Sequence, residues 1–153
     1  MLLSLVVFIF ISLQHAGLGI FVLLRNPANS INQRFCVFAL TFSVWVFFVF
    51  CVLQTTDPLL ATFRLRLVFC TALFIPSTFF FFSSIFPDYI ERPIDRYLSI
   101  FFFAVSFLLS FFSPYIVESV SFVKQLHQAR YGRLFPVFWL YFMSCMAYSL
   151  YIL

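Results

Sequence analysis

Residues 35–53 read FCVFALTFSVWVFFVFCVL, a stretch without a single charged side chain. The hydrocarbon core of a bilayer is about 30 Å thick, so an α-helix needs about 20 mainly apolar residues to cross it. A helix over this stretch has that length and carries Trp45 inside the bilayer. The stretch therefore predicts a transmembrane helix and is the reference for the rest of the chain.

Four further apolar stretches of similar length lie on either side of it. They cover residues 2–24, 67–86, 97–117 and 134–153. The first has no basic n-region and no small-residue cleavage site, so we interpret it as a retained anchor and not as a signal peptide. We predict an all-α fold, a polytopic transmembrane helical bundle of about five spanning helices in one membrane domain over residues 1–153.

The composition excludes a soluble globular domain. The chain has 153 residues, of which 64% are hydrophobic and 9% charged, whereas soluble domains carry about 25% charged residues. A small domain leaves much of its surface in water and could not hide this much apolar surface. The net charge of +4 is scattered, without a basic run of the kind that binds nucleic acid. We expect the lipid bilayer as partner, and no nucleic acid.

Residues that carry chemistry are few. The five acidic residues lie in loops or at the ends of predicted spans. The cysteines all lie in apolar stretches, without a CxxC pair or a nearby histidine at metal-ligand spacing: Cys36, Cys51, Cys70 and Cys145. A membrane enzyme needs polar groups clustered at one depth, and the sequence indicates none. We therefore expect no enzymatic activity, no catalytic residue, no metal and no cofactor.

Polar side chains inside a membrane are functional hypotheses by default. Gln14 and His15 lie together in the middle of the first span. His15 either takes part in proton transfer or ligand binding, which requires a partner inside the bundle, or one of the two residues forms an interhelical hydrogen bond. The sequence leaves both interpretations open.

The start of the third span has residues typical of a helix cap, followed by two arginines. Thr56 or Asp57 can cap its helix, with Pro58 in the first turn. Arg64 and Arg66 follow, and they are either interfacial anchors that reach the headgroups or residues that face a ligand cavity. We favour the anchors, because both arginines lie near the start of the span.

Pro76 lies in the middle of the third span. It removes one backbone donor and frees the carbonyl of Ala72, so we predict a kink. Thr71, Ser77 and Thr78 are the nearby hydroxyls that can satisfy the freed groups. The kink is either static or a hinge that takes part in signalling.

The longest polar stretch, residues 118–133, has two possible structures. Alternation over residues 119–122 favours a strand, whereas the spacing of Val120, Val123 and Leu126 is equally compatible with an interfacial helix. His127 lacks the Glu and the Leu-Arg-Thr-Pro that follow the phosphoacceptor of histidine kinases. We therefore exclude autophosphorylation by this chain.

Several features occur in a characteristic order. The first span ends in a basic Asn-Pro turn within residues 24–35, LRNPANSINQRF; the second carries Trp45, the third Pro76, and residues 131–135, YGRLF, lead into the last. This order resembles the N-terminal seven-helix membrane region of certain bacterial histidine kinases, with about five of the seven helices present. The resemblance implies an outside N-terminus, the inner (cytoplasmic) membrane, and a signal passed to kinase or cyclase-type output domains.

We therefore expect a multi-pass signal-input region of a histidine-kinase-type protein, without an output domain. Its partners would be a kinase or other output domain, or a second copy through self-association. The alternative is a small transporter subunit or a membrane protein of unrelated function. The last span ends at Leu153 without a basic anchor, so we expect a C-terminally truncated chain. The loop charges are nearly balanced and favour neither orientation.

Overall fold

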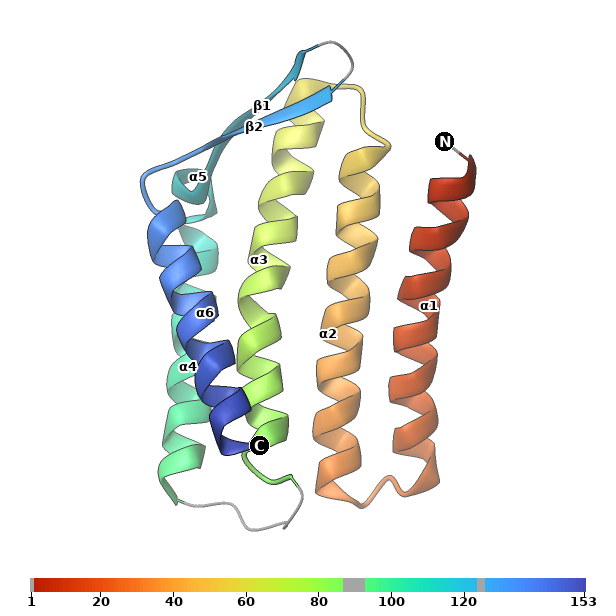
Figure 1. The fold of residues 1–153 in the computed structure, drawn as a ribbon, viewed down its shortest axis with the longest axis vertical. Helices are drawn as coiled ribbons and strands as arrows, with labels where there is room; N and C mark the ends of the chain where they lie inside the picture. The colour runs from red at the N-terminus through yellow and green to blue at the C-terminus, as the bar shows by residue number, and fades with distance from the viewer. Residues whose placement is uncertain (1, 87–92, 124–125) are drawn as a thin grey trace.

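The computed structural model describes residues 2–86, 93–123 and 126–153, and it is an all-α bundle with one small hairpin (Figure 1). Its elements are α1 (Leu2–Arg25), α2 (Ser30–Leu53), α3 (Pro58–Ser83), α4 (Pro93–Phe111), α5 (Ser113–Ile116), β1 (Val117–Val123), β2 (Leu126–Tyr131) and α6 (Phe135–Ile152). All the helices but α5 are long and apolar enough to cross a membrane. The predicted fold class is thereby confirmed.

The helix α3 lies at the centre of the bundle. On one side α2 and then α1 follow in a row, and on the other side α3 packs against α4 and α6 (Figure 1). Within the protein, 44% of the α3 span is buried, against 6% of the α1 span. The N-terminus and the hairpin lie at one end of the bundle and the C-terminus at the other, as an odd number of spans requires.

Two helices begin at side-chain caps. The Asp57 carboxylate accepts a hydrogen bond from the Leu59 amide at 3.1 Å, and Pro58 occupies the first turn. This confirms the predicted capping by Asp57. The Asn29 side chain caps α2 in the same way, so that helix begins at Ser30, five residues before the predicted span.

The predicted fourth span, 97–117, is wrong at both ends. The helix α4 begins earlier, at Pro93, and stops at Phe111. Pro114 has no amide hydrogen and disfavours helical geometry in the residue before it, so the chain breaks and restarts as the single turn α5. Val117 therefore belongs to β1 and not to a membrane helix.

The polar stretch that the sequence left open is an antiparallel hairpin. The strand β1 pairs with β2 from Val117 opposite Tyr131 to Val123 opposite Leu126, with an irregularity near Val117. Gly132 closes it where the chain returns to α6, and its amide donates to the Ile116 carbonyl at 3.0 Å. A Cβ at this position would lie 2.1 Å from a carbonyl oxygen, so the junction accommodates only glycine.

The main buried cluster lies where α3, α5, β1 and α6 meet. It contains Ala72, Leu73, Ile116, Val117 and Phe138. Trp45 of α2 packs against it from the side, so this tryptophan takes part in packing. The helix α3 is continuous through Pro76 from Pro58 to Ser83, and the kink there stays a prediction.

Candidate functional site

Three hydroxyl groups from three different helices meet inside the bundle. Ser77 of α3, Ser106 of α4 and Tyr141 of α6 form a triangle in which each oxygen lies 2.7 Å from the other two. Both serines are fully buried and the tyrosine is half-buried. We call these residues the hydroxyl cluster.

The cluster has more acceptors than hydrogens. Besides the triangle, Ser77 and Tyr141 both approach the Phe102 carbonyl, at 3.2 and 2.9 Å, and Ser106 approaches the Leu73 carbonyl at 2.7 Å. Each hydroxyl has one hydrogen to donate, so three hydrogens serve six short contacts. Several choices of donor and acceptor are therefore compatible with the same atomic positions. The hydroxyl hydrogens can change partners while each hydroxyl still donates one hydrogen bond.

The chemistry of the cluster is hydrogen bonding. A serine or tyrosine becomes a nucleophile when a base lies beside it, and the neighbours found here are hydroxyls and main-chain carbonyls. Nor do three or more His, Cys, Asp or Glu residues meet at a possible metal site within the described ranges. The cluster can thus hold helices in register or accept a polar group.

The cluster lies beside Pro76, where the sequence predicts a kink. Thr71 donates to carbonyls of its own helix, as does Thr78, in each case three and four residues earlier. Ser77 instead reaches across to α4, and Ser106 of α4 donates back to Leu73, one residue after the carbonyl that Pro76 frees. Pro76 is thus next to the point where α4 and α6 bind to α3 through side chains.

Gln14 and His15 lie apart from this cluster, on the outermost helix α1. The His15 Nδ1 atom lies 2.8 Å from the Ile11 carbonyl of the same helix, and the ring packs on Phe42 of α2 at 4.7 Å. A carbonyl only accepts, so Nδ1 carries the hydrogen. This hydrogen bond lies within α1, so it is not the interhelical hydrogen bond that the sequence suggested for Gln14 or His15. Gln14 is exposed.

Arg64 and Arg66 both bind main-chain carbonyls of neighbouring elements. Arg64 donates to the Cys51 carbonyl at 2.8 Å and to the Thr55 hydroxyl, at the C-terminal end of α2. Arg66 donates to the Val117 and Glu118 carbonyls, each at 3.0 Å. Arg64 also offsets the negative end of the α2 helix dipole, because it is a cation near the C-terminus of that helix. Both arginines join neighbouring elements at the hairpin end of the bundle.

Arg34 has the same role at the opposite end, which the sequence did not reveal. It donates to the Phe81 carbonyl at 2.9 Å and to the Ser84 hydroxyl at 3.0 Å, and lies 4.0 Å from the Phe81 ring centre. It thereby ties the start of α2 to the end of α3. Its position 47 residues from Phe81 in the sequence gives no local signal of this contact.

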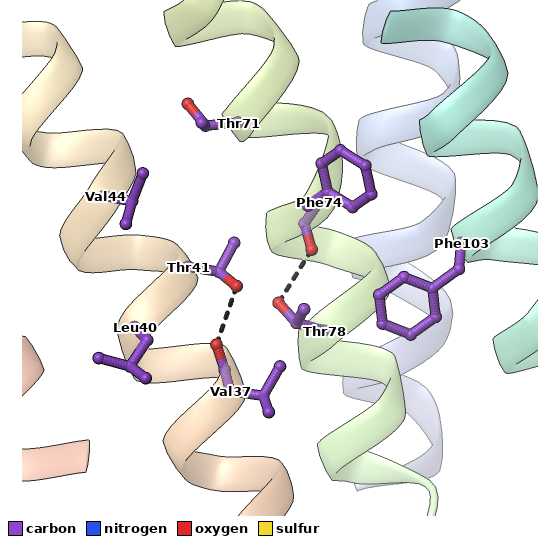
Figure 2. Close-up of a pocket in the computed structure, with 8 residues that line it drawn as sticks. All are labelled: Val37, Leu40, Thr41, Val44, Thr71, Phe74, Thr78 and Phe103. Carbon is purple, nitrogen blue, oxygen red and sulfur yellow. Dashed lines mark hydrogen bonds between the residues drawn. The ribbon is translucent and has the colours of Figure 1, made fainter. Parts of the chain in front are cut away.

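A pocket of about 410 Å³ lies between α2 and α3 and is a second candidate site besides the hydroxyl cluster (Figure 2). Its lining is aliphatic and aromatic apart from three threonines, whose hydroxyls donate to carbonyls of their own helices. Figure 2 shows two of these hydrogen bonds, from Thr41 and Thr78. The pocket therefore offers an apolar surface, suited to a lipid tail, without a free polar group to orient a ligand.

One acidic residue has an environment that the sequence did not predict. Asp95, expected in a loop, lies in the first turn of α4 and is only 7% exposed. Ser99, one turn further along α4, is also buried, and its hydroxyl has no hydrogen-bond partner among the described residues. The buried face of α4 is thus polar along its length, from Asp95 through Ser99 to Ser106.

The members of the hydroxyl cluster were each visible in the sequence, but not as a group. The sequence predicts for Ser77 only that its hydroxyl can satisfy backbone groups freed by Pro76. Each is a polar residue inside a predicted span, which is the available signal. Their proximity depends on how α3, α4 and α6 are rotated about their axes, which the sequence does not show.

Comparison with known proteins adds no assignment: no protein-family model, no curated protein and no solved structure matches this chain. The site is therefore interpreted from its own geometry.

Proposed function

We propose that the chain is the membrane-embedded signal-input region of a histidine-kinase-type signalling protein, located in the cytoplasmic membrane. The observation that supports this most is the hydroxyl cluster, which joins α3, α4 and α6 next to Pro76. The order of basic turn, Trp45 and Pro76 along the chain supports the same family. The proposal assigns no enzymatic step to this chain.

The proposed mechanism is a change in the packing of α6 against α3 and α4. A stimulus shifts a two-state equilibrium only if it interacts differently with the two states. Tyr141 is the only residue of α6 in the cluster. If Tyr141 moves away, Ser77 and Ser106 remain within hydrogen-bonding distance of one another and of their carbonyl acceptors. In a second arrangement Ser77 and Ser106 therefore still have hydrogen-bond partners, which makes that arrangement energetically accessible.

The test begins with the DNA beyond codon 153 and the neighbouring genes. The proposal predicts an output domain of kinase type, either in frame or in an adjacent gene. Phosphorylation of that output is then measured in membranes with Tyr141→Phe, which removes the hydrogen-bonding group of α6, and with the exposed control Ser144→Ala. A changed phosphorylation level with Tyr141→Phe alone supports the proposal. The absence of any output domain, or equal levels in both variants, contradicts it.

A transporter subunit is the second candidate, and Asp95 is the observation in its favour. Transporters carry carboxylates that face the bundle interior, and Asp95 is buried at one end of α4. In vesicles containing the chain, this alternative predicts substrate or proton flux that Asp95→Asn abolishes. Equal flux in empty vesicles and in vesicles with the chain would dismiss it.

A further inference from the structure

The two sides of α1 differ in character. Towards α2 the helix presents small residues: the Ser12 hydroxyl lies 3.0 Å from that of Ser43, and Gly19 is buried against Ala39. Small residues let two helix backbones approach closely in a membrane. This side is therefore an interface that is already occupied.

The opposite side of α1 has the spacing of an interface but no occupant. Five residues are separated alternately by four and three positions, as at the a and d positions of a coiled coil: Phe10, Gln14, Gly17, Phe21 and Leu24. All are exposed. We call this set the outer stripe of α1. In Figure 1 α1 lies at the edge of the bundle, so the stripe is accessible from the side.

Gln14 is the residue that makes the stripe more than a lipid-facing surface. It lies near the middle of the span Val6–Arg25, too deep for its amide to reach either interface. No hydrogen bond joins its side chain to any other residue that the structure describes. An amide left without a partner in hydrocarbon is costly, whereas glutamine amides bind one another across transmembrane helices.

We propose that the outer stripe of α1 binds a second copy of this chain. All copies insert in the same direction, so two α1 helices related by a two-fold axis along the membrane normal are parallel. Equivalent residues then lie at the same depth, and Gln14 meets Gln14. Each amide has both donors and an acceptor, so the pair can exchange two hydrogen bonds.

Gly17, one turn further along the stripe, provides the room for this contact. A Cβ at Gly17 would have no neighbouring atom within 4 Å, so the backbone is open on this side. The same symmetry places the two Gly17 residues together, where the absent side chains permit close approach. Two-fold dimers are also the commonest closed assemblies of identical chains. The inference does not depend on the signalling proposal.

The test measures association of the full chain in phosphatidylcholine vesicles. One fluorophore at the N-terminus reports the fraction of dimers by single-molecule photobleaching as the chain is diluted in lipid. We expect dimers for the wild type, and for Gln14→Leu a dissociation constant raised about tenfold, equivalent to about 1.4 kcal/mol. Leucine is favourable in lipid, so this variant retains insertion.

Two further variants make the result specific. Gln14→Asn keeps the amide and should retain the dimer, and Ile20→Ala, exposed on α1 but beside the stripe, should leave the dissociation constant unchanged. A wild-type chain that remains monomeric at every dilution would overturn the proposal, because the stripe would then face lipid or another protein. Gln14→Leu dimers as tight as the wild type would overturn it as well.

Discussion

At the scale of single residues, the glycines of α1 show how position decides the effect of one methyl group. Gly17 and Gly19 are two residues apart on one helix, with the same intrinsic preference for a larger residue. A Cβ at Gly17 enters open space, whereas a Cβ at Gly19 would lie 2.9 Å from the Ala39 Cβ. The sequence shows two equivalent glycines, and only the packing of α1 on α2 distinguishes them.

Gly19→Ala should therefore destabilise the protein and Gly17→Ala should not. Forcing a methyl group into a packed interface costs about 1–3 kcal/mol, while alanine in a helix gains up to about 1 kcal/mol over glycine. Unfolding in detergent micelles under monomeric conditions measures both variants. Equal stabilities would mean that α1 does not pack on α2 through Gly19.

The hydroxyl cluster makes a second prediction at this scale. Ser106→Ala and Tyr141→Phe should each cost about 1 kcal/mol of unfolding free energy. Because the two oxygens lie 2.7 Å apart, the double variant should lose less than the sum of the two. The control pair is Tyr141→Phe with Ser144→Ala, whose hydroxyl donates to its own helix. Additive losses in the first pair would show that the contact is absent.

At the scale of elements, prediction from the sequence succeeded where a local signal exists. Helix lengths follow from apolar runs, and the start of α3 follows from Asp57 and Pro58. The end of α4 was misplaced because Phe, Tyr and Ile continue past Phe111 in apolar character, while Pro114 alone stops the helix. The hairpin could not be chosen over an interfacial helix, because its stability comes from contacts with distant Arg66 and Thr62.

Replacement of Arg66 should loosen the hairpin. Its guanidinium donates to two carbonyls of β1, and a hydrogen bond to a charged group contributes about 1.5–3 kcal/mol where water does not compete. With partial exposure we expect amide hydrogen exchange across residues 117–123 to speed up about tenfold in Arg66→Gln, equivalent to about 1.4 kcal/mol. Arg133→Gln, an exposed arginine close to the hairpin, is the control. Unchanged exchange in Arg66→Gln would contradict the assigned contact.

At the scale of the whole molecule, the solvent determines the architecture. The bundle leaves large apolar side chains exposed along every long helix, Phe10, Leu59 and Tyr151 among them, which water would not tolerate and lipid favours. Inside the bundle, hydroxyls of different helices bind one another, and at its ends arginines bind main-chain carbonyls. Composition alone predicted this class, whereas the positions of the internal contacts depend on how the helices pack.

The most direct test of the account is where the loops lie relative to the membrane. Thr56 follows α2 and Asn26 precedes it, and both are exposed, so cysteines introduced singly at these positions should react from opposite sides. In sealed vesicles an impermeant maleimide should label one of Thr56→Cys and Asn26→Cys at once, and the other only after permeabilisation. Labelling of both from the same side of an intact membrane would contradict a spanning α2, and with it the membrane bundle.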